Sequence, residues 1–181
     1  MTDVVKVAID TQLSGEAAIA KVRELLPAFR SGMLVTHAVN PSIGREHSIR
    51  PMALQGDTRT FGGALWFFAD ERSHKVEEIN HDSRTSVLFQ SDDDIRYLHL
   101  FGEASVVRDR ARMHELYTPL VRTWFPDGLD DPHLTLIRFD AHGGSFWDSP
   151  AGLLQVLGAF TKSVGIGKPG KGGADSGTLV L

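Results

Sequence analysis

The sequence predicts a mainly β fold, an antiparallel barrel whose gaps are filled by a few helices. Two observations support this prediction. Most strand-like segments follow one another with only a turn between them, and stretches with helical spacing of apolar residues are few and short. A doubly wound parallel sheet would need a crossover helix between nearly every pair of strands, and this order of elements does not provide one.

Each element is predicted from its own pattern. Apolar residues recur at three- and four-residue spacing after Ser14, which predicts a helix that Ser14 caps and Pro27 kinks or ends. A short second helix over residues 73–80 is capped by Ser73, and a third helix follows Asp109. The predicted strands cover residues 33–38, 48–55, 64–69, 84–90, 95–108, 134–139 and 145–147, and a last helix covers residues 153–160.

Single residues predict details of the sheet. Pro51 cannot donate a backbone hydrogen bond, so its strand should lie at an edge or contain a bulge. Gly102 interrupts a long alternating segment, as a bulge would. In the same segment Tyr97, His99 and Phe101 share one face of the strand, because side chains alternate with a period of two.

Composition excludes several classes of protein. The chain has 181 residues, and we expect one domain over residues 1–164, with an N-terminal helix, followed by a disordered Gly- and Lys-rich tail over residues 165–181. A net charge of −4 argues against nucleic acid as a partner, and the absence of cysteine excludes disulfides and thiolate chemistry. No segment has the pattern of a membrane span or a signal peptide, so the expected location is the cytoplasm.

Three further motif searches do not predict a function. Gly165, Gly167 and Gly170 satisfy G-x-G-x-x-G, but no strand and helix surround them, so a flexible tail is the better interpretation. The eight histidines lack metal-ligand spacing, and we therefore predict no metal site. The G-x-S-x-G elbow of serine hydrolases is absent from the sequence.

The segment LWFFADERSHKVEEI, residues 65–79, carries the strongest chemical signal. A buried strand runs into a turn and then into a helix that opens at Ser73, where free backbone N–H groups and Lys75 would attract a monophosphate. Arg50, in a mostly apolar strand, would add a second cation. The alternative is that Ser73 only caps the helix and both cations lie in water. Trp147, near the end of the last strand, suits the core as well as a ligand platform.

These segments, in this order, resemble the FMN-binding split-barrel superfamily typified by pyridoxamine 5′-phosphate oxidase, and within it the bacterial general stress proteins. The likeness runs from about residue 22 to residue 160. It is carried by SIRPM (48–52), LWFFADERSHKVEEI (65–79), RTSVLF (84–89), YLHLFGEASVVRDR (97–110), WFPDGLDDP (124–132) and FWDSP (146–150).

The resemblance implies a six-stranded antiparallel split β-barrel with flanking helices. It also implies a homodimer with one FMN in each of two interface clefts. Carried over by position, it implies that Ser73, His74 and Lys75 form the phosphate-binding turn and that Arg50 approaches the phosphate or ribityl chain. The full set of implied cofactor-binding residues is Arg50, Pro51, Met52, Phe68, Ala69, Ser73, His74, Lys75 and, from the other subunit, Trp147.

Three departures from the oxidase pattern bear on activity. Gln55 stands where the oxidase has a phosphate-binding lysine, His74 replaces an arginine, and no arginine–x–histidine element follows Trp147. We therefore expect a modest affinity for the cofactor and no oxidation of pyridoxamine phosphate.

Three functions remain open from the sequence. The first is an FMN-binding protein of the general stress type with weak or no turnover. The second is an FMN-dependent oxidoreductase acting on an unknown small molecule, in which the flavin carries the electrons and no protein acid or base is required. The third is a haem-handling or purely structural dimer on the same fold. The sequence does not separate FMN from FAD.

Overall fold

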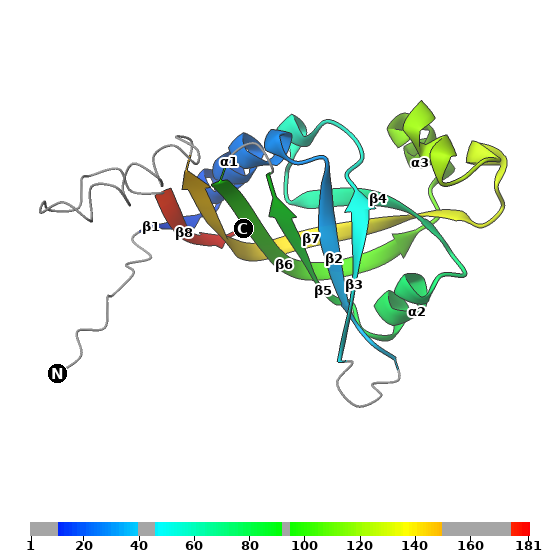
Figure 1. Cartoon of the computed structure of the whole chain (residues 1–181), viewed down its shortest axis with the longest axis horizontal. Coiled ribbons are helices and arrows are strands. Elements are labelled where there is room, and N and C mark those ends of the chain that lie inside the picture. The colour runs from blue at the N-terminus through cyan, green and yellow to red at the C-terminus, as the bar shows by residue number, and fades with distance from the viewer. Residues whose placement is uncertain (1–10, 40–45, 92–94, 150–174) are drawn as a thin grey trace, which may run out of the picture.

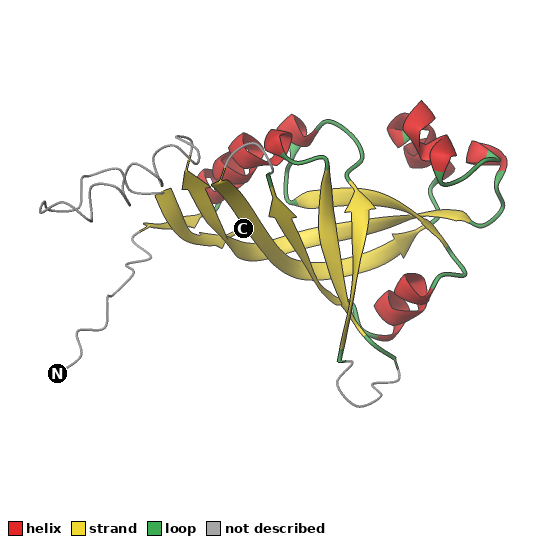
Figure 2. Cartoon of the chain, viewed as in Figure 1, coloured by secondary structure: helices red, strands yellow, loops and turns green. Residues whose placement is uncertain are grey.

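The computed structural model describes residues 11–39, 46–91, 95–149 and 175–181. These residues form one sheet of eight strands with a few helices (Figure 1, Figure 2). The strands are β1 (Thr11–Ser14), β2 (Ser31–His37), β3 (His47–Ala53), β4 (Ala64–Asp70), β5 (Arg84–Gln90), β6 (Ile95–Val107), β7 (Leu134–Ser149) and β8 (Asp175–Val180). The α-helices are α1 (Glu16–Leu25), α2 (His74–His81) and α3 (Arg110–Leu116), and the 3₁₀ helices are η1 (Leu26–Ala28), η2 (Thr58–Thr60), η3 (Pro119–Thr123) and η4 (Gly128–Asp130).

The sheet follows the order β1-β8-β7-β6-β5-β2-β3, and β4 pairs with β7 beside this path. One bridge, between Gln55 and Trp66, joins the chain just after β3 to β4. Among the described strands, β1 and β8 run parallel and the other pairs are antiparallel. The prediction of a mainly β fold is confirmed. The sheet has eight strands rather than six, because β1 and β8 extend it.

Two predicted irregularities are confirmed. Pro51 lies in β3, which ends the strand order, so its missing N–H does not interrupt an interior ladder. The register between β6 and β7 shifts between Phe101 and Gly102. Phe101 pairs with Gly143 and Gly102 with Ala141, so the extra residue of the bulge is His142 of β7. A Cβ at Gly102 would lie 1.9 Å from the carbonyl oxygen of Asp140, so this position opposite the bulge requires glycine.

The prediction for residues 134–147 is wrong in one respect. Residues 134–139 and 145–147 were expected to be two strands joined at Gly143 and Gly144, yet β7 is a single strand of 16 residues. A Cβ on Gly144 would lie 2.0 Å from the carbonyl oxygen of His99 in β6. The glycines therefore allow close approach of neighbouring strands and do not form a turn. Figure 1 shows β7 and β6 running side by side along the sheet.

The tail corrects a second prediction. Residues 165–181 were expected to be disordered, but residues 175–180 form β8, which pairs with β7 and with β1. Leu179 is 2% exposed, so the strand is anchored in the core by a side chain as well as by its ladders. The sheet therefore includes residues beyond the expected domain end at 164. Residues 165–174 and the predicted helix over 153–160 lie outside the described residues.

The helices agree with the sequence in position more than in their ends. Helix α1 begins one residue after Gly15, whose φ of 55° turns the chain, and Ser14 belongs to β1 and does not cap the helix. Pro27 ends α1 as predicted, within η1. The Asp109 side chain accepts a hydrogen bond from the Arg112 N–H, which confirms the predicted cap of α3.

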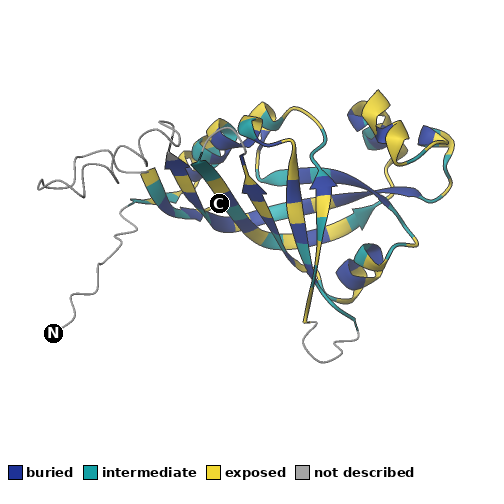
Figure 3. Ribbon diagram, viewed as in Figure 1, coloured by how far each residue is buried: buried dark blue, intermediate teal, exposed yellow. Residues whose placement is uncertain are grey.

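The core has two parts. Buried and exposed residues alternate along the strands (Figure 3), and the inner face of the sheet packs with residues of α1 and α2, including Val22, Val76 and Ile79. A smaller cluster lies by α3, where Phe68 packs with Met113 and its neighbours. No helix in the described ranges is long and apolar enough to cross a membrane.

Candidate functional site

The turn between β4 and α2 is held by one residue, Asp70. Its carboxylate accepts the backbone N–H of Arg72 at 2.8 Å and the Arg72 guanidinium at 2.6 Å. These hydrogen bonds lower the pKa of Asp70 to about 2. Its carbonyl oxygen accepts hydrogen bonds from the Ser73 N–H at 3.0 Å and from the Ser73 hydroxyl at 2.6 Å. Ser73 is the N-cap residue of α2, as predicted, but its side chain makes no capping hydrogen bond to the helix and bonds to the preceding turn instead.

A buried carboxylate, Glu78, anchors α2 to the sheet. Its Oε2 accepts hydrogen bonds from the Thr36 hydroxyl at 2.6 Å and from Arg50 at 2.7 Å, and its Oε1 accepts one from the Ser48 hydroxyl at 2.6 Å. Arg50 also donates to Thr36 Oγ1 at 2.6 Å. Burial by itself would raise the pKa of Glu78, but these hydrogen bonds and the charge of Arg50 hold it below its ordinary value. Glu78 is thus ionised and ties β2, β3 and α2 together.

Lys75 lies one helical turn before Glu78 and is half-buried. Burial and then the nearby charge of Arg50 lower the pKa of Lys75, while Asp70 and Glu78 act in the opposite direction. Within the described part of the chain, no carboxylate oxygen lies within 4.0 Å of its ammonium group. The start of α2 therefore carries a partly buried positive charge with no ion-pair partner, next to a second cation.

The predicted cofactor residues divide into groups. Arg50, Ser73 and Lys75 gather at the start of α2 as expected. The side chain of His74 is 96% exposed and lies near Glu77, so it points away from this site.

The apolar members of the predicted set are mostly core residues. Met52, Phe68 and Ala69 are buried, and Phe68 packs edge-on against the ring of Tyr117. Of these three residues, chiefly backbone atoms would be available to a ligand. Pro51 is exposed on the opposite face of β3 from Arg50.

Trp147 lies far from the start of α2 within one chain. It belongs to β7, and the strands β2, β5 and β6 separate β7 from the strand of Arg50. Trp147 is 42% exposed and projects from the face of the sheet that is turned away from α1 and α2. Arg50 lies on the other face of the sheet, so one chain does not place these two side chains on the same side.

The face of the sheet that is turned away from α1 and α2 carries large exposed apolar side chains. We call it the outer face, and its exposed bands on β2, β3, β5 and β6 are visible in Figure 3. Strand register places these residues on one side, because Met33 faces Leu88, Ile49 faces Val35, and Tyr97 faces Trp147. The large apolar residues of this face that are at least 41% exposed are Met33, Ile49, Leu88, Tyr97, Phe101, Trp147 and Val180.

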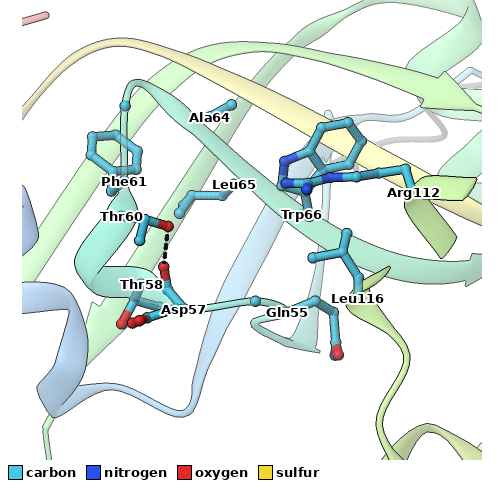
Figure 4. A pocket seen from close by; sticks show the side chains of 12 residues that line it. Gln55, Asp57, Thr58, Thr60, Phe61, Ala64, Leu65, Trp66, Arg112 and Leu116 are labelled. Atoms are coloured by element: carbon cyan, nitrogen blue, oxygen red, sulfur yellow. Dashed lines mark hydrogen bonds between the residues drawn. The ribbon is translucent and has the colours of Figure 1, made fainter. Parts of the chain in front are cut away.

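A pocket of about 190 Å³ lies between the loop after β3, the start of β4 and helix α3 (Figure 4). The guanidinium of Arg112 stacks over the ring of Trp66 at 4.9 Å, and Arg138 lies 5.8 Å from the same ring. The lining residues are Gln55, Gly56, Asp57, Thr58, Thr60, Phe61, Gly62, Ala64, Leu65, Trp66, Arg112 and Leu116. Gln55 is one of the positions at which the sequence departs from the oxidase pattern.

Sequence reasoning missed the partners of Arg50. Glu78 lies between Val76 and Ile79, which face inward, and it shares a helical face with Lys75. An acid in that position, together with an arginine in an apolar strand, is a signal for a buried ion pair. Thr36 and the pocket beside Arg112 gave no such signal, because both depend on which strands and helices become neighbours.

The fold and the site together define a mainly β protein with a partly buried cationic site at a strand-to-helix turn. The model of the family described as "Pyridoxamine 5'-phosphate oxidase like" matches residues 17–169. The chain belongs to this family.

Individual relatives agree with this assignment. The Neurospora crassa protein bli-3 is 26% identical over 128 residues, which cover 66% of this chain, and the chain spans 61% of the length of that relative. A solved structure of a putative general stress protein 26 from Jannaschia sp. CCS1 has a TM-score of 0.69 at 22% identity and covers 91% of this chain and 98% of its own. A pyridoxamine 5′-phosphate oxidase-related, FMN binding protein from Nostoc punctiforme has a TM-score of 0.53 at 16% identity, covering 72% and 79% of the two chains. Both structures share the fold.

Proposed function

We propose that this chain is an FMN-binding protein of the general stress type, with weak or no turnover, and that it holds the cofactor at a homodimer interface. The observation that carries the proposal is Lys75, a half-buried cation beside Arg50 that has no carboxylate partner among the described residues. An ammonium group in this setting is stabilised by a bound anion. The residues at the start of α2 therefore fit the phosphate of a flavin mononucleotide.

The charges of the site set the strength of this binding. Arg50 is already neutralised by Glu78 at 2.7 Å, and His74, which replaces the arginine of the oxidase pattern, is exposed. Lys75 and the backbone N–H groups of α2 thus supply most of the attraction for a phosphate. We expect an affinity below that of a site with several unpaired cations.

A second copy of the chain would complete the site. The outer face presents seven large apolar side chains, and patches of this kind on soluble proteins mark association surfaces. Trp147 lies on that face, whereas Arg50 lies on the inner face of the sheet. A partner docked there would supply its own Trp147 to the ring of a flavin whose phosphate is held by the first copy.

The pocket beside Arg112 favours an alternative function, an FMN-dependent oxidoreductase acting on an unknown small molecule other than pyridoxamine phosphate. The pocket lies at Gln55 and Trp66, at the ends of β3 and β4 that are distant from the start of α2. A flavin extending along these strands would place its ring toward the pocket. Bound flavin supplies hydride and electron transfer, and the pocket would position the reacting molecule.

The absorption spectrum of the protein as purified tests the cofactor, together with the mass of the ligand released on denaturation. We expect flavin bands and the mass of FMN. A Soret band without flavin bands would contradict the proposal, and the mass of FAD would correct the identity of the nucleotide.

Anaerobic mixing with reduced nicotinamide separates the two functions. Retention of the oxidised flavin spectrum is the result expected for a binding protein. Bleaching of the flavin would favour the oxidoreductase.

A further inference from the structure

His99 occupies the middle of the outer face. It lies in β6, directly between Leu88 of β5 and Ser145 of β7, and it is half-buried in the single chain. Its ring centroid lies 6.2 Å from that of Phe101. By strand register, its neighbours on this face are Ser86, Leu88, Gln90, Tyr97, Phe101, Gly143, Ser145 and Trp147.

None of these neighbours carries a charge near neutral pH. Among the residues that the structure describes, the nearest charged residues on this face lie four positions along the strands, in the row that joins Arg84 to Glu103 and Glu103 to Asp140. The exposed His142 of β7, beside Gly143, is the nearest other titratable group. Four residues correspond to about 13 Å, beyond the screening length of physiological salt. Burial lowers the pKa of His99. Within the described parts of β5, β6 and β7, a protonated His99 therefore has no counterion within reach.

Two other histidines lie at the rim of the same face, in a different setting. His37 and His47 face each other across β2 and β3 with ring centroids 4.8 Å apart. Nδ1 of His37 lies 3.7 Å from the carboxylate of Asp82. A positive charge on His37 thus has a counterion, whereas a charge on His99 does not.

We propose that the outer face binds a second copy of the chain only while His99 is neutral, so that acidification dissociates the dimer. The inference rests on the proposed homodimer. Docking removes water from the middle of the face, and an unpaired imidazolium loses its hydration there without gaining a partner. The dimer therefore holds fewer protons than two separate chains.

The sign and the size of the effect follow from proton linkage. Because dissociation is accompanied by proton uptake, raising the pH favours the dimer and lowering it favours the monomer. A two-fold dimer contains two copies of His99. Below the pKa of His99 in the monomer, the dissociation constant should rise by up to about 100-fold per pH unit.

The test is the dimer dissociation constant between about pH 8 and about pH 5, the range in which histidine titrates, from sedimentation with fluorescence detection. In the unmodified protein the constant should rise steeply as the pH falls. In His99→Gln, which keeps a polar side chain but cannot be protonated, it should stay nearly constant. His47→Gln is the control and should follow the unmodified protein.

The outcomes are distinct. A constant that does not change with pH in the unmodified protein, or one that changes equally in His99→Gln, overturns the inference and leaves the dimer intact. A chain that is monomeric at every pH contradicts the proposed dimer itself.

Where His99→Gln does not fold, the pKa of His99 is measured by NMR. The unmodified dimer is compared with the variant Ile49→Lys, which we expect to be monomeric and whose new charge lies three strands away from that of His99. A lower pKa in the dimer supports the inference, and equal values overturn it.

Discussion

Lys75 and Glu78 lie one turn apart on α2 in opposite electrostatic situations. Glu78 is buried and accepts three hydrogen bonds, from Thr36, Ser48 and Arg50. Lys75 is half-buried and has no ion-pair partner in the described part of the chain. The first residue therefore stabilises the fold, and the second is available to a ligand. This difference separates the effects of substituting them.

Replacing Lys75 by alanine should weaken FMN binding by about 1.5–3 kcal/mol, the range of a charge-assisted hydrogen bond. Stability should change little, because no ion pair is lost. Arg59→Ala is the control, since it removes the same charge from an exposed pair with Asp57. Titration of the apoprotein with FMN measures both variants, and unchanged affinity in Lys75→Ala would place the phosphate elsewhere.

Replacing Glu78 by glutamine should lower the free energy of unfolding by about 3 kcal/mol. The substitution leaves Arg50 without its counterion, and it puts an NH2 group, which can only donate, where a carboxylate oxygen accepted a hydrogen bond. Glu77→Gln, an exposed neighbour on the same helix, should change it little. Urea unfolding of both variants makes the measurement, and equal losses would show that the buried network does not stabilise the fold.

The pH dependence of stability gives an independent check on Glu78. Its pKa in the folded chain lies below the ordinary value of a glutamate. Its contribution is therefore fully present above about pH 4.5 and is lost as the pH falls through the folded pKa. The difference in stability between the unmodified protein and Glu78→Gln should shrink on acidification.

At the scale of elements, β7 shows how glycine serves a strand. It pairs with β4, β6 and β8, and its Gly144 has the carbonyl of His99 close on one side. Glycine inside the sequence suggested a turn, because glycine is common in turns. The same residue also fits a strand where two backbones approach closely, and the choice depends on the neighbouring strand.

Gly144→Ala should lower the free energy of unfolding by about 3 kcal/mol or more, because the added Cβ meets backbone atoms that cannot rotate away. Gly62→Ala is the matched control, since its nearest atom lies 4.0 Å from the new Cβ. That variant should stay within about 1 kcal/mol of the unmodified protein. Thermal unfolding compares them, and a well-tolerated alanine at position 144 would contradict the close strand packing.

At the scale of the whole molecule, the curved sheet has two faces with different tasks. The inner face packs with α1 and α2, and Arg50 and Thr36 on that side meet Glu78 of α2. The outer face leaves large apolar side chains exposed. In the proposed dimer the two faces would act together, because the partner's outer face would complete the cofactor site that begins with Lys75 and Arg50 of the first copy.

Leu88→Lys should abolish the dimer, since it places a charge in the middle of the apolar outer face. FMN binding should fall with it, because Trp147 of the partner subunit is lost from the site. Leu120→Lys is the control, being 67% exposed on η3 and absent from this face. Light scattering and FMN titration measure both properties, and a dimer that survives Leu88→Lys would show that the chains associate elsewhere.

Much of the fold was predictable from local pattern. The alternation in residues 84–90 and the spacing of Val76 and Ile79 predicted β5 and α2, because side-chain period reflects which face is buried. The cations Arg50 and Lys75 were predictable as residue types in unusual places. Glu78 as the partner of Arg50 was not, because the two residues are separated by 28 positions and meet only when α2 packs on β3.

The sequence by itself determined the mainly β class, the edge position of Pro51, the bulge at Gly102 and the family. These follow from backbone constraints and periodicities that act over a few residues. The tertiary structure decided that residues 175–180 form a strand, that Gly144 lies inside β7, and that Arg50 is neutralised while Lys75 is not. Each of these depends on contacts between segments that are distant in the sequence, and such contacts form only when the strands have paired in the folded sheet.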